Sequence, residues 1–145
     1  MLERDGTIRW RVHLASPRER VFDFLATPRR RAHFWAVSAP DRDGDIEFHF
    51  GNGETLRSRV LTREPPQRFV LTYFDDSVVT FELLAADGGG TELVLTETGA
   101  AEASRIDQHA GWVSVLLGLK AAVDHGIDLR NHDAQRTWDR GYADV

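Results

Sequence analysis

The sequence contains no cysteine among its 145 residues. Disulfide bonds, thiolate catalysis and cysteine-based metal sites are therefore excluded. No apolar run approaches the ~18 residues that a membrane-spanning helix needs. The N-terminus, Met1 to Gly6, lacks the basic-then-apolar profile of a signal peptide. We therefore expect no membrane insertion and a cytoplasmic location.

Basic residues are also fewer than acidic ones: the chain has 18 Lys and Arg residues and 23 Asp and Glu residues, which gives a net charge of −5. Nucleic-acid binding draws most of its affinity from a concentrated basic face, so no such partner is expected. Arg29, Arg30 and Arg31 form the one basic run, which predicts a solvated helix face. With 41% apolar residues, we expect one domain over residues 1–145, with a core at about 7–130 and a tail at 131–145.

Catalytic and metal-binding motifs are missing as well. No serine stands in the Gly-x-Ser-x-Gly elbow of hydrolases. Gly88–Gly90 lies in a hairpin, without the lysine and following helix of a phosphate loop. The aspartates within 41–45 begin like a calcium loop, but Ile46 replaces its glycine and Asn52 its glutamate. The six histidines form no short-spaced ligand pair, whereas zinc needs three or four ligands. We expect no metal, no cofactor and no catalytic residue.

What is present is a sequence of short strands and one long helix. Apolar residues alternate from Ile8 to Leu14, which predicts a strand with one buried face. The segment Ser16–Glu19 then offers a capping serine, a proline and a closing glutamate for a short helix. Thr27-Pro28 starts a second short helix. Five further strands are predicted at about 46–50, 55–61, 69–74, 78–85 and 91–98, separated by glycine-, proline- and aspartate-rich turns.

The long helix runs from Ser104 to His125, with a capping signature at Ser104–Asp107 and Gly126 as its C-terminal cap. Its apolar residues recur at helical spacing, and its length of roughly 33 Å is enough to cross a sheet. The order of elements predicts an α+β fold: a curved antiparallel sheet of about six strands around one long C-terminal helix, with two short helices after the first strand. Such a fold often encloses a cavity. Trp138 and Tyr142 predict that the end of the tail packs onto the protein.

This order resembles the START-like (SRPBCC) superfamily with its helix-grip fold, and within it the branch of the activator of heat-shock protein 90 ATPase homologues. The resemblance covers about Thr7 to Arg130 and is carried by the following residues: Ser16-Pro-x-Glu19 with Val21-Phe22, Trp35, Arg63-Glu-Pro-Pro66, Val79-Thr-Phe81-Glu, Gly90-Thr91-x-Leu-x-Leu95, and His109-x-Gly-Trp112 with Leu116 and Leu119. It implies that a small hydrophobic or amphipathic molecule binds between sheet and helix. Some members are polyketide cyclases. The eukaryotic activators carry a further chaperone-binding domain, so chaperone activation is not carried over.

The candidate ligand-binding residues are apolar side chains expected to give the cavity its shape, with two polar anchors. The apolar set is Trp35, Phe48, Phe50, Phe81, Trp112, Leu116 and Leu119, and the anchors are His109 and Arg57. Aromatic residues at such spacings are also typical of an ordinary core. His109 is either a polar group at the cavity mouth or a hydrogen-bonded histidine of the first helical turns. Gly111 and Gly118 indicate either close backbone approach or space left for a ligand.

The sequence thus predicts the binding of a small hydrophobic or amphipathic molecule. Two alternatives stay open: an enzyme of cyclase or hydrolase type that uses the same cavity, and a protein that acts through its surface on a chaperone. A second copy of the chain is a further candidate partner.

Overall fold

A seven-stranded antiparallel sheet forms one layer of the protein, in the order β1-β7-β6-β5-β4-β3-β2. The computed structural model describes all residues from Met1 to Val145. The strands are β1 Ile8–Leu14, β2 Asp41–Arg42, β3 Asp45–His49, β4 Thr55–Glu64, β5 Arg68–Thr72, β6 Val78–Ala85 and β7 Thr91–Thr98. The prediction of about six strands missed β2, because a two-residue strand is too short to show an alternating pattern.

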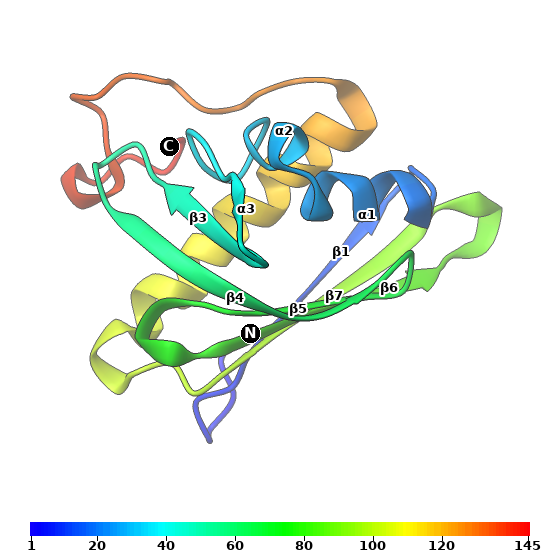
Figure 1. Cartoon of the computed structure of the whole chain (residues 1–145), viewed down its shortest axis with the longest axis horizontal. Coiled ribbons are helices and arrows are strands. Elements are labelled where there is room, and N and C mark those ends of the chain that lie inside the picture. The colour runs from blue at the N-terminus through cyan, green and yellow to red at the C-terminus, as the bar shows by residue number, and fades with distance from the viewer.

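Three α-helices cover one face of this sheet (Figure 1). They are α1 Arg18–Ala26, α2 Pro28–Arg31 and α3 Arg105–His125, and four short 3-10 turns are η1 Phe74–Asp76, η2 Asp87–Gly89, η3 Glu102–Ser104 and η4 Trp138–Arg140. The long helix α3 crosses the sheet, and the chain after it runs back over the helices (Figure 1). The predicted α+β helix-grip architecture, with two short helices after the first strand, is confirmed.

The core lies between α3 and the concave face of the sheet. Trp112, Leu116, Leu119 and Val123 of α3 are all buried there, at the spacing that the sequence predicts. Burial of each such side chain contributes roughly 1.5–3 kcal/mol. Gly126 ends the helix as predicted: it has a left-handed φ of 67°, and its N–H donates to the carbonyl of Ala122. This packing fixes which face of α3 points toward the sheet.

Both predicted capping serines have other partners. The Ser16 hydroxyl donates to the backbone carbonyl of Val123 (3.1 Å) and to a carboxylate oxygen of Asp124 (2.7 Å) at the end of α3. The Ser104 hydroxyl donates to Asp75 (3.0 Å). Neither serine caps its own helix. Both side chains bond to elements distant in sequence, and a local motif cannot reveal such contacts.

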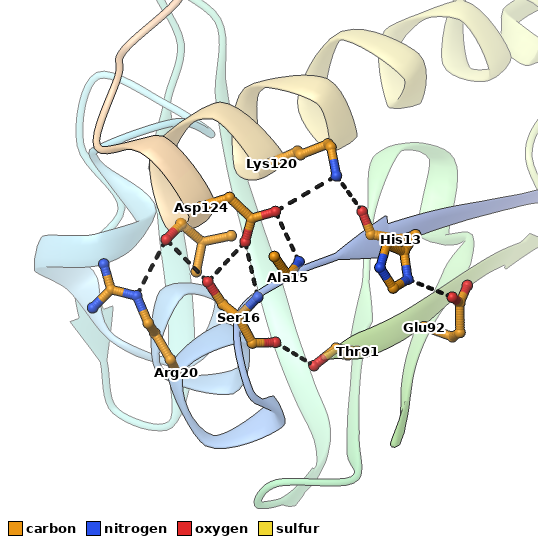
Figure 2. A network of polar contacts seen from close by, with 9 residues as sticks. His13, Ala15, Ser16, Arg20, Thr91, Glu92, Lys120 and Asp124 are labelled. Atoms are coloured by element: carbon orange, nitrogen blue, oxygen red, sulfur yellow. Dashed lines mark hydrogen bonds and ion pairs between the residues drawn. The ribbon is translucent and has the colours of Figure 1, made fainter. Parts of the chain in front are cut away.

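Asp124 joins the C-terminal end of α3 to the end of β1 (Figure 2). Its carboxylate accepts the backbone N–H groups of Ala15 (2.9 Å) and Ser16 (3.0 Å), and Lys120 lies 3.5 Å away. Burial opposes ionisation of this carboxylate, but these hydrogen bonds outweigh it and the pKa of Asp124 is lowered. The C-terminal end of α3 is therefore tied to the end of β1.

Arg31 corrects the expectation of a solvated basic face. Its side chain is fully buried and donates to the carbonyls of Leu25 and Ala39 and to the carboxylate of Asp41 (2.7 Å). Successive helical residues point about 100° apart, so three arginines in one turn cannot all face solvent. Arg31 is the one that faces inward, and it ties α2 to the segment before β2.

Candidate functional site

A cavity of about 830 Å³ opens between the N-terminal half of α3, the β3–β4 hairpin, η1 and the chain after α3. This volume is in the range of small-molecule sites. Six aromatic residues from five parts of the chain contribute to the lining: Trp35, Phe50, Tyr73, Phe74, Trp112 and Trp138. The site therefore depends on the complete fold rather than on any one motif.

Two glycines of α3 have different structural roles. A Cβ atom at Gly111 would have no neighbour within 4 Å, and Gly111 lines the cavity. A Cβ atom at Gly118 would lie 3.6 Å from the carbonyl oxygen of Phe34. A side chain at Gly118 would thus begin in ordinary contact with the segment after α2, whereas Gly111 leaves space in the cavity.

Tyr73 stands at the centre of the aromatic lining. Its ring lies 4.8 Å from that of Trp112 and 6.3 Å from that of Trp35, measured between centroids. The Trp35 indole N–H donates to the Tyr73 hydroxyl (3.2 Å), and no group of the protein accepts the proton of that hydroxyl. Burial raises the pKa of Tyr73, so the phenol remains protonated. Because Tyr73 lines the cavity, its hydroxyl is a candidate donor to a bound molecule.

Glu97 holds Trp112 in place from the sheet side. Its fully buried carboxylate accepts the Trp112 indole N–H (2.6 Å) and the Ser77 hydroxyl (2.6 Å). Burial raises the pKa of Glu97, although both hydrogen bonds favour the ionised form. We did not predict this residue from the sequence. The alternation of Leu93, Leu95 and Glu97 along β7 was the signal that places it on the inner face.

The chain after α3 closes one side of the cavity. Arg130 donates to the carbonyls of Ala36 (2.7 Å) and Ala32 (2.6 Å), which ties this segment to the residues after α2. Further along, Thr137 is buried and Trp138 lines the cavity. The predicted packing of the tail is thus confirmed for Trp138, whereas Tyr142 is 41% exposed; the contribution of the tail to the site has no signal in the sequence, since the segment has no regular pattern.

Three of the nine predicted site residues line the cavity: Trp35, Phe50 and Trp112. Four others, Phe48, Phe81, Leu116 and Leu119, are buried behind the lining. Phe81, for example, packs edge-on against Trp112 at 5.9 Å. These four side chains support the lining residues and do not reach the cavity surface.

The two predicted polar anchors lie outside the cavity. The ring of His109 stacks on that of Trp10 of β1, with 4.9 Å between their centroids. Two helical steps of about 100° each separate His109 from Gly111, so the two point about 200° apart around α3 and His109 faces away from the cavity. Desolvation lowers the pKa of His109. Arg57 pairs with Asp45 (2.8 Å) and is exposed, since the alternation of β4 turns its neighbours Leu56 and Ser58 inward.

Among the ionisable side chains of the lining, most are acidic. The acidic ones are Glu54, Asp75, Asp107, Asp133 and Asp139, against Arg130 and His132. No group of three or more histidine and carboxylate side chains is arranged to hold a metal ion. None of the helices combines the length and apolar character required to cross a bilayer.

The curved sheet, the crossing helix and the cavity beside it define a START-like helix-grip domain. A family model described as Activator of Hsp90 ATPase homolog 1-like protein matches residues 15–124, and the chain belongs to this family. The resemblance stated from the sequence is thereby confirmed. Among curated proteins, none matches the sequence significantly.

Solved structures show the same fold. A protein from Staphylococcus saprophyticus is 24% identical, with a TM-score of 0.73 over 83% of this chain and 93% of that one. The Aha1 dimer from Colwellia psychrerythraea is 18% identical, with a TM-score of 0.73 over 83% and 97%. DynU16, from the dynemicin biosynthetic locus, is 23% identical, with a TM-score of 0.72 over 84% of this chain and 48% of that one.

Proposed function

We propose that the protein binds a small apolar or amphipathic molecule in the cavity beside α3. The observation that carries this proposal is the aromatic lining around about 830 Å³ of space, which Gly111 leaves open. Ligand sites of this kind are concave and mostly apolar, with a few polar groups that orient the ligand. The membership in a START-like family, with its fold built around a cavity, supports the same function.

Binding without turnover fits the side chains of the lining better than catalysis. His132 is the only histidine there, and its ring nitrogen contacts Asp128 (2.7 Å). No serine, threonine or tyrosine of the lining shares a hydrogen bond with a histidine, which is the arrangement that activates a nucleophile. We therefore propose a carrier or sensor of its ligand rather than a cyclase or hydrolase.

Substitutions at Gly111 test this function, because they add volume to the cavity alone. Gly111→Leu should weaken the binding of (methoxynaphthyl)ethanol, a neutral probe with an apolar body, by at least about tenfold in calorimetric titration. Gly111→Ala is the matched control, since a methyl group occupies far less of the cavity, and it should bind within about threefold of the wild type. Both changes favour the helix by up to about 1 kcal/mol, so the fold is retained. Absence of binding to the wild type, or equal binding by the Leu variant, would contradict the proposal.

We also propose that two copies of the chain associate. The structure from Colwellia psychrerythraea was solved as a dimer. In the present chain, an apolar stripe of Ile106, Ala110, Val113 and Leu117 lies on the outer face of α3. Ile106 is 73% exposed and Leu117 is 52% exposed. A stripe at this helical spacing is suited to pack against its own copy across a two-fold axis.

A further inference from the structure

Besides Asp139 of η4, three carboxylates of the cavity lining take part in no ion pair within the protein. Glu54 belongs to the turn between β3 and β4, Asp75 to η1, and Asp107 to the first turn of α3. None of them takes part in an ion pair, whereas Asp133 is paired with Arg136. Three separate elements thus bring uncompensated negative charge to one cavity.

The cations of the lining are already engaged. The guanidinium of Arg130 donates to Ala32, Ala36 and Asp128, and its side chain is only 10% exposed. His132 contacts the same carboxylate of Asp128. Both groups are thus paired with a carboxylate, whereas Glu54, Asp75 and Asp107 are unpaired, so the excess charge at the cavity is negative.

The aromatic lining favours the same sign of ligand charge. The faces of Trp and Tyr rings attract cations, and Trp112, Tyr73 and Trp35 lie within 4.8–6.3 Å of one another. In addition, Tyr73 is 7% exposed, and its hydroxyl accepts from Trp35 while its own proton has no acceptor in the protein. A ligand that satisfies this donor has an oxygen or nitrogen acceptor on its apolar part.

Resting on the proposed binding function, we propose that the cavity selects a protonated amine on an apolar aromatic body, with a hydrogen-bond acceptor within reach of Tyr73. The ammonium group lies toward Glu54, Asp75 and Asp107, and the body stacks among the aromatic rings. Anionic amphiphiles, including fatty acids, are disfavoured in this site because the carboxylates repel them.

Three probes that share one body separate charge from shape: (methoxynaphthyl)ethylamine, (methoxynaphthyl)ethanol and (methoxynaphthyl)acetate. In calorimetric titrations of the wild-type protein, we expect the amine to bind about tenfold more tightly than the alcohol, and the acetate to bind most weakly. Added salt should weaken the binding of the amine and leave the binding of the alcohol unchanged, because salt screens only the contact between charges.

Two variants assign the roles to residues. Asp75→Asn combined with Asp107→Asn should lower the affinity for the amine toward that for the alcohol, since only Glu54 of the three carboxylates remains, and should leave the affinity for the alcohol unchanged. Asn is tolerated at position 75, where φ is 58°, so the turn is kept. Asp87→Asn, in the distant turn between β6 and β7, is the matched control and should change neither affinity. Tyr73→Phe should weaken amine and alcohol alike, by about threefold to tenfold, because the methoxy acceptor loses its donor.

The possible results separate this inference from the proposed function. If no probe binds, both are overturned. If the alcohol binds and the amine binds no better, or if the acetate binds best, the cavity binds apolar molecules but does not select cations. If Tyr73→Phe changes the affinity for neither probe, then Tyr73 does not donate a hydrogen bond to the ligand, and this part of the inference is overturned. Tighter amine binding that is reduced in the double Asn variant supports the inference.

Discussion

At the scale of single residues, Glu97 holds the cavity residue Trp112 through a buried hydrogen bond. We expect Glu97→Leu to lower the free energy of unfolding by about 2–4 kcal/mol, because the buried N–H of Trp112 and hydroxyl of Ser77 lose their acceptor. Glu97→Gln is the matched control. Its amide oxygen can accept from Trp112 while its amide N–H₂ donates to Ser77, so its cost at neutral pH should stay within about 1 kcal/mol. Urea unfolding measures both.

Comparison of the wild type with Glu97→Gln also reports the protonation of Glu97. Because burial raises the pKa of Glu97 above its ordinary value of 4.5, the folded state retains a proton that the unfolded state has lost. Wild-type stability relative to Glu97→Gln should therefore be constant below pH 4.5 and fall as the pH rises through the raised pKa. If the difference stays constant across this window, or rises with pH, then Glu97 ionises in the folded protein at least as readily as in the unfolded chain, which contradicts the prediction.

At the scale of elements, the segment after α3 is the part of the site with the fewest regular contacts. We expect Arg130→Ala to release it, since the variant removes the hydrogen bonds to Ala32 and Ala36. Hydrogen exchange should become faster in residues 131–145 and remain unchanged in β5, β6 and β7. Affinity for the neutral probe should fall as well, because Trp138 belongs to this segment.

Arg136→Ala is the control for this prediction. Arg136 is more exposed than Arg130, and its ion pair with Asp133 lies within the segment itself. Its loss should leave both exchange and binding close to those of the wild type. Equal effects of the two substitutions would show that Arg130 has no special part in holding the segment against the cavity.

The elements differ in how far the sequence reveals them. Alternation along β1, β6 and β7 and the apolar spacing of α3 predict these elements within a residue of their bounds, because one face of each is buried against a single core. The same periodicity does not tell a core residue from a cavity residue, so Phe48 and Phe81 could not be separated from Phe50.

Side chains whose contacts lie far away in the sequence could not be placed from the sequence alone. His109 lies at the edge of the buried face of α3, as its spacing indicates, but the edge is the one that faces β1. Tyr73 falls within the predicted strand at 69–74 but directly follows the end of β5 at Thr72, and Trp138 lies in η4, well beyond the end of α3, where no period exists to place it. The position of each depends on tertiary contacts such as those of Arg130, which no local pattern encodes.

At the scale of the whole molecule, the apolar stripe on α3 lies on a different face of the helix from the cavity lining. Residues 107, 111 and 115 of α3 face the cavity, whereas Ile106, Val113 and Leu117 face outward. Association through the stripe would thus leave the cavity accessible. Dimer formation and ligand binding can then be tested independently of each other.

We expect the wild-type protein to sediment at twice its chain mass of 16.4 kDa, and Leu117→Glu to sediment as a single chain. A charge at the centre of a two-fold interface is repeated by symmetry, so the like charges of the two copies repel each other. Leu84→Glu, on the outer face of β6, is the matched control because Leu84 is 49% exposed and Leu117 is 52% exposed. It should leave the dimer intact. If the wild-type protein sediments as a single chain, or if both variants dissociate alike, the stripe on α3 is not the interface, and its apolar residues have another role.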